Sequence, residues 1–153
     1  MSEYFKTGVL VDDLECAMRD LGGWLGLSWT PIQEVPLVLR TATGDEQVDL
    51  RFVFSTGSPP YLELLQAQPT GYYAASQGEH IHHVGRWVPD LAVASRELEA
   101  AGFPLEAAGV DADGNTPSLF CFHKGAHGLR IELAGGAGRE GFEAWLAGGE
   151  LDL

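Results

Sequence analysis

Two stretches of the chain share one pattern: residues 6–14 read KTGVLVDDL, and residues 83–91 read HVGRWVPDL. Glycine, valine, aspartate and leucine recur in register, and in each copy a strand-like run passes into a helical one. Later in each half comes a short apolar strand with a central glutamate, LEL at 62–64 and IEL at 131–133. An internal duplication determines the architecture before any single residue is interpreted. It singles out four positions: Lys6, Glu63, His83 and Glu132.

The hydrophobic pattern extends the repeat into two similar halves. We expect β-α-β-β-β in the first, with strands at 4–11, 32–41, 46–56 and 61–66. Asp12 or Asp13 caps its helix, and the pair Gly22-Gly23 is expected to end or weaken it. The second half repeats the order, with strands at 82–88, 105–110, 118–123 and 129–133 and a helix between Asp90 and Gly102.

These two halves predict an α+β fold in which two βαβββ modules form curved mixed sheets around a concave cleft. At 153 residues we expect a single domain. Module one covers about 4–68, a linker rich in Gly, Ser, Gln and Tyr about 69–80, and module two about 81–134. A C-terminal helix is expected at about 138–147.

Strand alternation predicts which side chains face the cleft. Residues i and i+2 of a strand share a face, so each central glutamate of LEL and IEL points away from its apolar neighbours. If those neighbours pack against the helices, Glu63 and Glu132 face the cleft. Trp87 shares a face with His83, and Tyr61 with Glu63, so Trp87 and Tyr61 are expected to line a substrate pocket.

Alternation and chain position also suggest roles for His82, Tyr72 and Tyr73. His82 follows the same alternation and is expected to face away from His83, as a surface histidine or one behind the site. Tyr72 and Tyr73 in the linker form a candidate lid.

Charge and composition exclude several classes of function. The formal net charge is −13 with only nine Lys and Arg, which argues against nucleic acid as a partner. No apolar run is long enough to span a membrane, so we expect no membrane partner. The start MSEYFKTG lacks the features of a secretory signal, so the expected location is cytoplasmic.

The duplicated motifs resemble the vicinal oxygen chelate superfamily, which includes glyoxalase I, methylmalonyl-CoA epimerase, extradiol dioxygenases, and the fosfomycin and bleomycin resistance proteins. The chain is most similar to small glyoxalase-like members that open with a strand reading H-x-G-x-x-V-x-D-L. The resemblance covers about residues 4–133. It implies a small-molecule ligand and, because members with this layout often pair, a homodimer.

In metal-dependent members, four side chains on these strands hold a divalent cation. The matching positions here are Lys6, Glu63, His83 and Glu132. The last three have ligand chemistry suited to Zn, Ni, Mn, Co or Fe. Lys6 is a departure, because the family usually has histidine there and a protonated lysine repels a cation. The same departure breaks the two-histidine, one-carboxylate iron site of an extradiol dioxygenase.

Three interpretations of these side chains stay open. A metal binds through Glu63, His83 and Glu132 alone, and Lys6 swings away. Alternatively there is no metal, and Lys6 replaces the charge of the cation between the two carboxylates. In the third interpretation the glutamates and Lys6 are catalytic: one glutamate removes a proton next to a carbonyl, and Lys6 stabilises the enolate oxygen.

The resemblance implies a lyase- or isomerase-type enzyme of the glyoxalase or epimerase kind. It would act by proton transfer next to a carbonyl of a small organic molecule, with Glu63 and Glu132 as base and acid. The alternative is a non-catalytic protein of the bleomycin-resistance kind that sequesters a small, antibiotic-type molecule. Loss of the first metal ligand favours the binder, whereas retention of three clustered polar groups favours the enzyme.

Overall fold

The computed structural model describes residues 3–75 and 80–152. Its first half contains β1 (Tyr4–Val11), α1 (Leu14–Leu25), β2 (Gln33–Thr41), β3 (Gly44–Phe54) and β4 (Tyr61–Gln66). Its second half contains β5 (Ile81–Val88), α2 (Leu91–Ala100), β6 (Leu105–Val110), β7 (Phe120–Lys124) and β8 (Arg130–Gly135). Helix α3 (Arg139–Leu146) follows. The predicted α+β fold of two βαβββ modules is confirmed.

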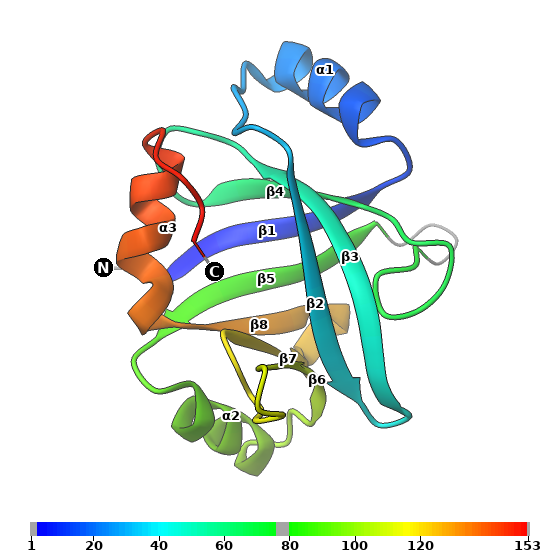
Figure 1. Cartoon of the computed structure of the whole chain (residues 1–153), viewed down its shortest axis with the longest axis vertical. Helices are drawn as coiled ribbons and strands as arrows, with labels where there is room; N and C mark the ends of the chain where they lie inside the picture. The colour runs from blue at the N-terminus through cyan, green and yellow to red at the C-terminus, as the bar shows by residue number, and fades with distance from the viewer. Residues whose placement is uncertain (1–2, 76–79, 153) are drawn as a thin grey trace.

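The strands form one closed barrel in the order β1-β4-β3-β2-β6-β7-β8-β5 (Figure 1). Strands β1 and β5 pair antiparallel, and each has the last strand of its own module as a parallel neighbour. On the opposite side β2 pairs with β6, from Val38↔Val110 to Thr41↔Ala107. The expected concave sheets therefore continue into a barrel, because this pairing joins the two modules at a second seam.

Pro36 lies where β2 has a single neighbour. It is paired with Asp49 on β3, whereas pairing with β6 begins only at Val38. Proline has no N–H to donate to a ladder, so it is tolerated on the unpaired side of a strand. Pro36 thus lies on an edge segment of β2.

Helices α1 and α2 cover the outside of the barrel (Figure 1). Leu62 and Leu64 pack in a cluster with residues of α1, and Ile131 and Leu133 pack in a cluster with residues of α2. The glutamates between these apolar residues consequently face the barrel interior, as strand alternation predicted.

Helix α1 starts where expected but runs further. The Asp13 side chain accepts a hydrogen bond from the Cys16 N–H at 2.8 Å. The helix passes through Gly22-Gly23 and ends at Gly26, whose φ of 66° is left-handed. The prediction that the glycine pair ends the helix was wrong. A β-carbon at Gly22 would lie 2.9 Å from Trp29 Nε1, so this glycine lets Trp29 pack on the helix.

The barrel interior is packed with apolar side chains. Its main cluster includes Leu39, Phe52, Phe54, Leu65 and Phe122. Helix α3 lies across one end of the barrel, near the start of β1 and the end of β8 (Figure 1). Its side chains Phe142 and Trp145 pack against that interior cluster. The predicted C-terminal helix is thus part of the core rather than an appendage.

The linker tyrosines are not a lid. Tyr73 is only 2% exposed and belongs to the interior cluster, and the Tyr72 ring packs against it. Both rings contact His82 and Phe122, at 5.0 to 6.2 Å between centroids. Both tyrosines therefore pack in the barrel interior as core residues. Residues 76–79 of the predicted linker lie outside the described residues.

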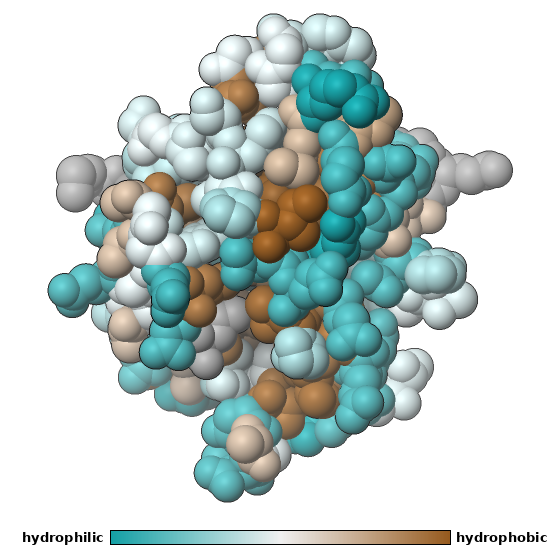
Figure 2. Space-filling view, turned by 45° about the horizontal axis from the view of Figure 1, so that its top comes forward, coloured by the Kyte–Doolittle hydropathy of each residue, from teal (hydrophilic) through white to brown (hydrophobic). Residues whose placement is uncertain are grey.

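The surface carries its apolar side chains in separate groups. Figure 2 shows brown apolar atoms scattered among teal and white ones on the face it presents. Trp24 and Ile81 are the most exposed large apolar side chains of the described residues, at 79% and 60%. Within 3–75 and 80–152, no helix combines the length and apolar character that crossing a membrane requires.

Candidate active site

The duplicated glycines bring the two repeats together. In the antiparallel pair of β1 and β5, Lys6 lies opposite Gly85, and Gly8 lies opposite His83. A β-carbon on Gly8 would lie 2.2 Å from His83 Cε1, and one on Gly85 would lie 2.8 Å from Lys6 Cγ. Each repeat therefore keeps a glycine where the side chain of the other repeat crosses its strand. This is the physical reason for the recurrence of glycine.

The parallel neighbours then supply the carboxylates. Gly8 is in register with Glu63 on β4, and Gly85 is in register with Glu132 on β8. The pseudo-symmetric repeat thereby gathers one lysine, one histidine and two glutamates in the barrel interior. All four are buried, with exposed fractions of 7% for Lys6, 4% for Glu63, 1% for His83 and 5% for Glu132.

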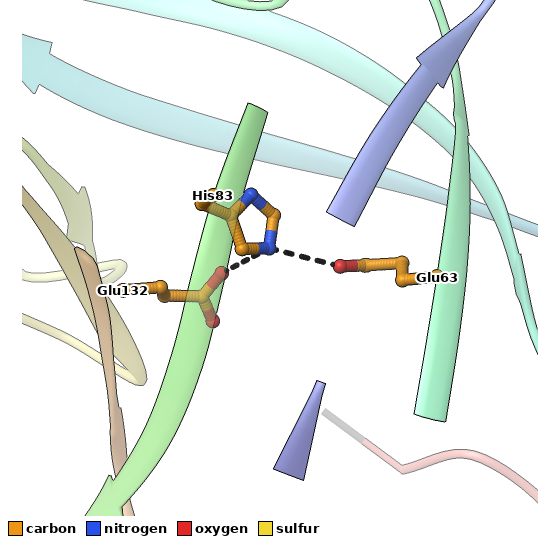
Figure 3. Close-up of side chains that lie close together, drawn as sticks. All are labelled: Glu63, His83 and Glu132. Atoms are coloured by element: carbon orange, nitrogen blue, oxygen red, sulfur yellow. Dashed lines mark hydrogen bonds and ion pairs between the residues drawn. The ribbon is translucent and has the colours of Figure 1, made fainter. Parts of the chain in front are cut away.

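The four side chains form a closed ring of charged contacts. Lys6 Nζ lies 3.0 Å from Glu63 Oε2 and 3.0 Å from Glu132 Oε2. His83 Nε2 lies 3.1 Å from the same oxygen of Glu63 and 3.0 Å from that of Glu132 (Figure 3). Each carboxylate oxygen is therefore shared between two nitrogen donors.

His82 determines the proton positions on His83. His82 Nε2 lies 3.2 Å from the Tyr72 carbonyl oxygen, which only accepts, so Nε2 carries the proton of a neutral His82. His82 Nδ1 is then an acceptor, 3.0 Å from His83 Nδ1, which must donate. Because His83 Nε2 also donates to the carboxylates, both nitrogens of His83 are protonated in this network.

The pKa shifts agree with this assignment. Burial lowers the pKa of His82 to about 3, with His83 adding to the effect. For His83, burial opposes the charged form, but Glu132 and hydrogen bonds to both carboxylates leave the pKa raised. The pKa of Lys6 is also raised, because the negative charges of Glu132 and Glu63 outweigh the effect of burial. Burial also opposes ionisation of Glu132, yet Lys6 and His83 lower its pKa to about 2. The charges of Lys6 and His83 thus outweigh the effect of burial on Glu132.

The expectation that His82 faces away from His83 was wrong. The two rings meet edge to face with centroids 5.3 Å apart, and His82 is 5% exposed. His82 lies near the start of β5, and the register of β1 with β5 shifts between Gly8 and Val9, so strict alternation does not hold there. His82 lies behind the site and orients His83. The sequence run HIHH at 80–83 was the signal that a second histidine could lie near His83.

Glu63, His83 and Glu132 form a cluster that could hold a metal ion, with one ligand atom from each within 4.8 Å of the others. As they stand, the side chains do not fit one. The Lys6 ammonium is already 3.0 Å from both carboxylate oxygens that would ligate, and like charge repels a cation. A protonated His83 Nε2 also has no lone pair to offer. Together Lys6 and His83 carry the charge of a divalent cation.

Aromatic rings cover this ring of charges on the side of α3. Lys6 Nζ lies 5.5 Å from the centroid of Phe5 and 5.4 Å from that of Phe54. The register of β1 with β5 shifts between Tyr4 and Lys6, which allows Phe5 and Lys6 both to face the interior. Trp87 stacks on Phe5 at 4.2 Å, and Tyr61 packs nearby. The two expected pocket residues thus lie at the barrel end beside the site.

Phe5 and Phe142 were not predicted to belong near the site. Phe5 was hidden because the β-bulge breaks the alternation that sequence reasoning assumed. Phe142 and Trp145 were expected to form a short helix on the body, and nothing in their spacing indicated that this helix covers the barrel end.

Comparison with solved structures supports the fold. A methylmalonyl-CoA epimerase variant from Streptomyces coelicolor, bound to 2-nitronate-propionyl-CoA, superposes with a TM-score of 0.63 at 17% identity, covering 90% of this chain and 96% of that one. The epimerase from Mycobacterium tuberculosis gives 0.59 at 20% identity, with 87% of each chain covered. A hypothetical protein from Bacillus halodurans gives 0.61 at 16% identity, covering 88% and 94%.

No curated protein sequence matches the chain. The sequence profile of the glyoxalase/bleomycin resistance protein/dioxygenase superfamily matches residues 5–122, which include three of the four gathered side chains. This match confirms the resemblance found in the duplicated motifs. The chain belongs to the glyoxalase/bleomycin resistance protein/dioxygenase superfamily.

Proposed function

We propose that this protein is an isomerase- or lyase-type enzyme that moves a proton at the carbon next to a carbonyl, without a metal ion. One observation carries the proposal: the Lys6 ammonium lies 3.0 Å from one oxygen of each of two buried glutamates. A positive donor between two potential bases is the arrangement that enolate formation requires.

In the proposed reaction the carboxylate of Glu63 removes the proton from the carbon. The electrons of the broken C–H bond form a C=C bond, and the carbonyl π electrons move to its oxygen. Lys6 donates a hydrogen bond to this developing oxyanion. Glu63 returns this proton to the carbon or to a neighbouring atom, which completes an isomerisation. For an epimerisation, His83 passes its Nε2 proton to Glu132, which delivers it to the opposite face, and His83 takes the abstracted proton from Glu63.

The electrostatics of the site support a switch in basicity. In the closed ring Lys6 and His83 hold the pKa of Glu132 at about 2, which makes it a weak base. When Lys6 turns to donate to a substrate oxygen, it no longer stabilises both carboxylates. The pKa of Glu132 then rises, and Glu132 becomes a more effective base when Lys6 donates to the substrate oxygen.

The test is exchange of carbon-bound hydrogen for deuterium in D₂O, followed by NMR. The carbonyl compounds tested include hemithioacetals and methylmalonyl-CoA, which is the ligand in a similar epimerase structure. Glu63→Gln and Glu132→Gln are expected to lower the exchange rate at least ~100-fold, the usual contribution of acid–base groups. Glu34→Gln, an exposed glutamate outside the barrel interior, is the matched control.

The sequestering protein is the competing class. A non-catalytic binder would bind compounds of this set, shown by thermal shift, without exchanging their hydrogen, and its binding would be insensitive to Glu63→Gln. Tight binding with no exchange for any compound would overturn the enzyme proposal.

A further inference from the structure

The ring of Phe142 fills an aromatic chamber at the barrel end. Its centroid lies 5.0 Å from that of Phe54, 5.6 Å from Phe5, 5.5 Å from Trp87 and 6.1 Å from Tyr61. These four rings come from four strands, so Phe142 from α3 enters a chamber built by the barrel itself.

The Lys6 ammonium lies against two of the rings of this chamber. The same Phe5 and Phe54 rings that surround Phe142 lie 5.5 Å and 5.4 Å from Lys6 Nζ. A group placed where Phe142 lies would therefore contact the same two rings as the lysine. Since all four charged side chains are at least nine-tenths buried, something must move before a substrate reaches them.

Helix α3 is short and is flanked by glycines. It has only eight residues, contains Gly141, and starts at Gly138 with no side-chain cap on its first turn. Gly135, Gly136 and Gly138 precede it, and Gly148 and Gly149 follow it. So short a helix is unstable alone in water. Its contacts with the barrel include an ion pair of Arg139 with Glu3 at 2.9 Å and the packing of Phe142, Trp145 and Leu146 against the interior cluster.

We propose that α3 is a lid that detaches from the barrel end, and that the ring of Phe142 marks the binding position of the apolar group of the substrate. The inference rests on the proposed function and names its substrate class: an uncharged carbonyl compound with a flat or branched apolar substituent. Four aromatic rings select the apolar substituent. Two carboxylates face Lys6 and His83, so an anion meets no net positive charge there.

The probe is acetophenone, a neutral aryl methyl ketone, titrated into the full-length protein. Backbone amide exchange of residues 139–146 and of β1 and β5 is followed by mass spectrometry, together with the dissociation constant. Phe142→Ala removes the ring that competes with the ligand. Ala144→Gln, at an exposed position of the same helix, is the matched control.

Phe142→Ala is expected to speed amide exchange in α3 at least ~10-fold and to leave β1 and β5 unchanged, because the partly buried Phe142 ring docks the helix together with Trp145. Acetophenone is expected to bind this variant about 10- to 100-fold more tightly than the parent protein. In the parent protein it should speed exchange in α3 while slowing it in β1 and β5. Ala144→Gln should change neither quantity.

Two results would overturn the proposal that α3 is a lid. The first is amide exchange in α3 that occurs only together with exchange in β5. The second is acetophenone binding that leaves α3 protected, because the ligand would then simply fill a cavity. Phenylacetate binding as tightly as acetophenone would overturn the substrate class. Deuterium entering the methyl group of acetophenone tests the chemistry separately. Release of α3 without hydrogen exchange in acetophenone or in any other compound of the set removes the proposed function and keeps the lid. Exchange with α3 still protected removes the lid and keeps the function.

Discussion

Gly8 and His83 lie in contact across the β1–β5 pair, so closely that a β-carbon at position 8 would overlap the imidazole ring. The contact joins the two halves of a duplicated sequence: a glycine in one repeat creates the space for the histidine of the other. The equivalent contact of Gly85 with Lys6 completes the exchange.

Gly8→Ala is expected to destabilise the protein by about 3 kcal/mol, because a rigid imidazole buried among fixed partners cannot yield. Gly85→Ala should cost less, since the flexible Lys6 chain can shift. Urea unfolding measures both. Gly23→Ala is the control: its β-carbon would meet nothing within 4 Å, so the better helix former should stabilise by about 0.5–1 kcal/mol. Equal effects at positions 8 and 23 would contradict the contact.

Lys6→His is expected to convert the site into a metal centre, because it removes the repelling ammonium and adds a fourth ligand. After dialysis against Ni²⁺, Zn²⁺, Mn²⁺ or Co²⁺, metal analysis should find about one ion per chain in this variant and far less in the parent protein. Glu132→Ala in the same background should remove it. Lys124→His, which adds a histidine at an exposed position, controls for adventitious binding. Stoichiometric metal in the parent protein would show that Lys6 is no obstacle.

The lowered pKa of Glu132 predicts that the free energy of unfolding depends on pH in the acid range. Its native pKa of about 2 lies below its ordinary value of 4.5, so its contribution is present above about pH 4.5 and is lost as the pH falls toward 2. We expect the free energy of unfolding of the parent protein to fall over this window more steeply than that of Glu132→Gln, by a slope approaching about one proton. Urea unfolding at stepped pH measures both curves. Parallel curves would mean that Glu132 is not stabilised as an anion.

A third buried histidine, His123, has its partners outside the charged ring. His123 Nδ1 donates to the Phe103 carbonyl oxygen at 2.8 Å, and its Nε2 accepts from Ser95 Oγ at 2.9 Å. Ser95→Ala would leave the buried Nε2 without its donor, at an expected cost of about 1–3 kcal/mol in unfolding free energy. Ser58→Ala, at an exposed turn, should cost nearly nothing. A loss of catalysis in Ser95→Ala without a loss of stability would contradict this assignment.

Local patterns were enough for the modules and for the residues that meet inside them. The repeated glycine, aspartate and leucine located the strands and helices, and LEL and IEL showed that both glutamates face inward. These inferences succeeded because strand alternation and helix capping act over a few residues. They failed at His82 and at Phe5, near shifts in register, because one extra residue reverses the face of its neighbours.

By itself, the sequence determined the two βαβββ modules, which follow from duplication and the two-residue period of strands. The gathering of Lys6, Glu63, His83 and Glu132 was implied by the resemblance to a known superfamily. Only the tertiary structure decided that β2 pairs with β6 to close the barrel, that α3 places Phe142 over the site, and that His82 orients His83. These contacts depend on strand twist and on packing between segments far apart in the chain, which no local pattern encodes.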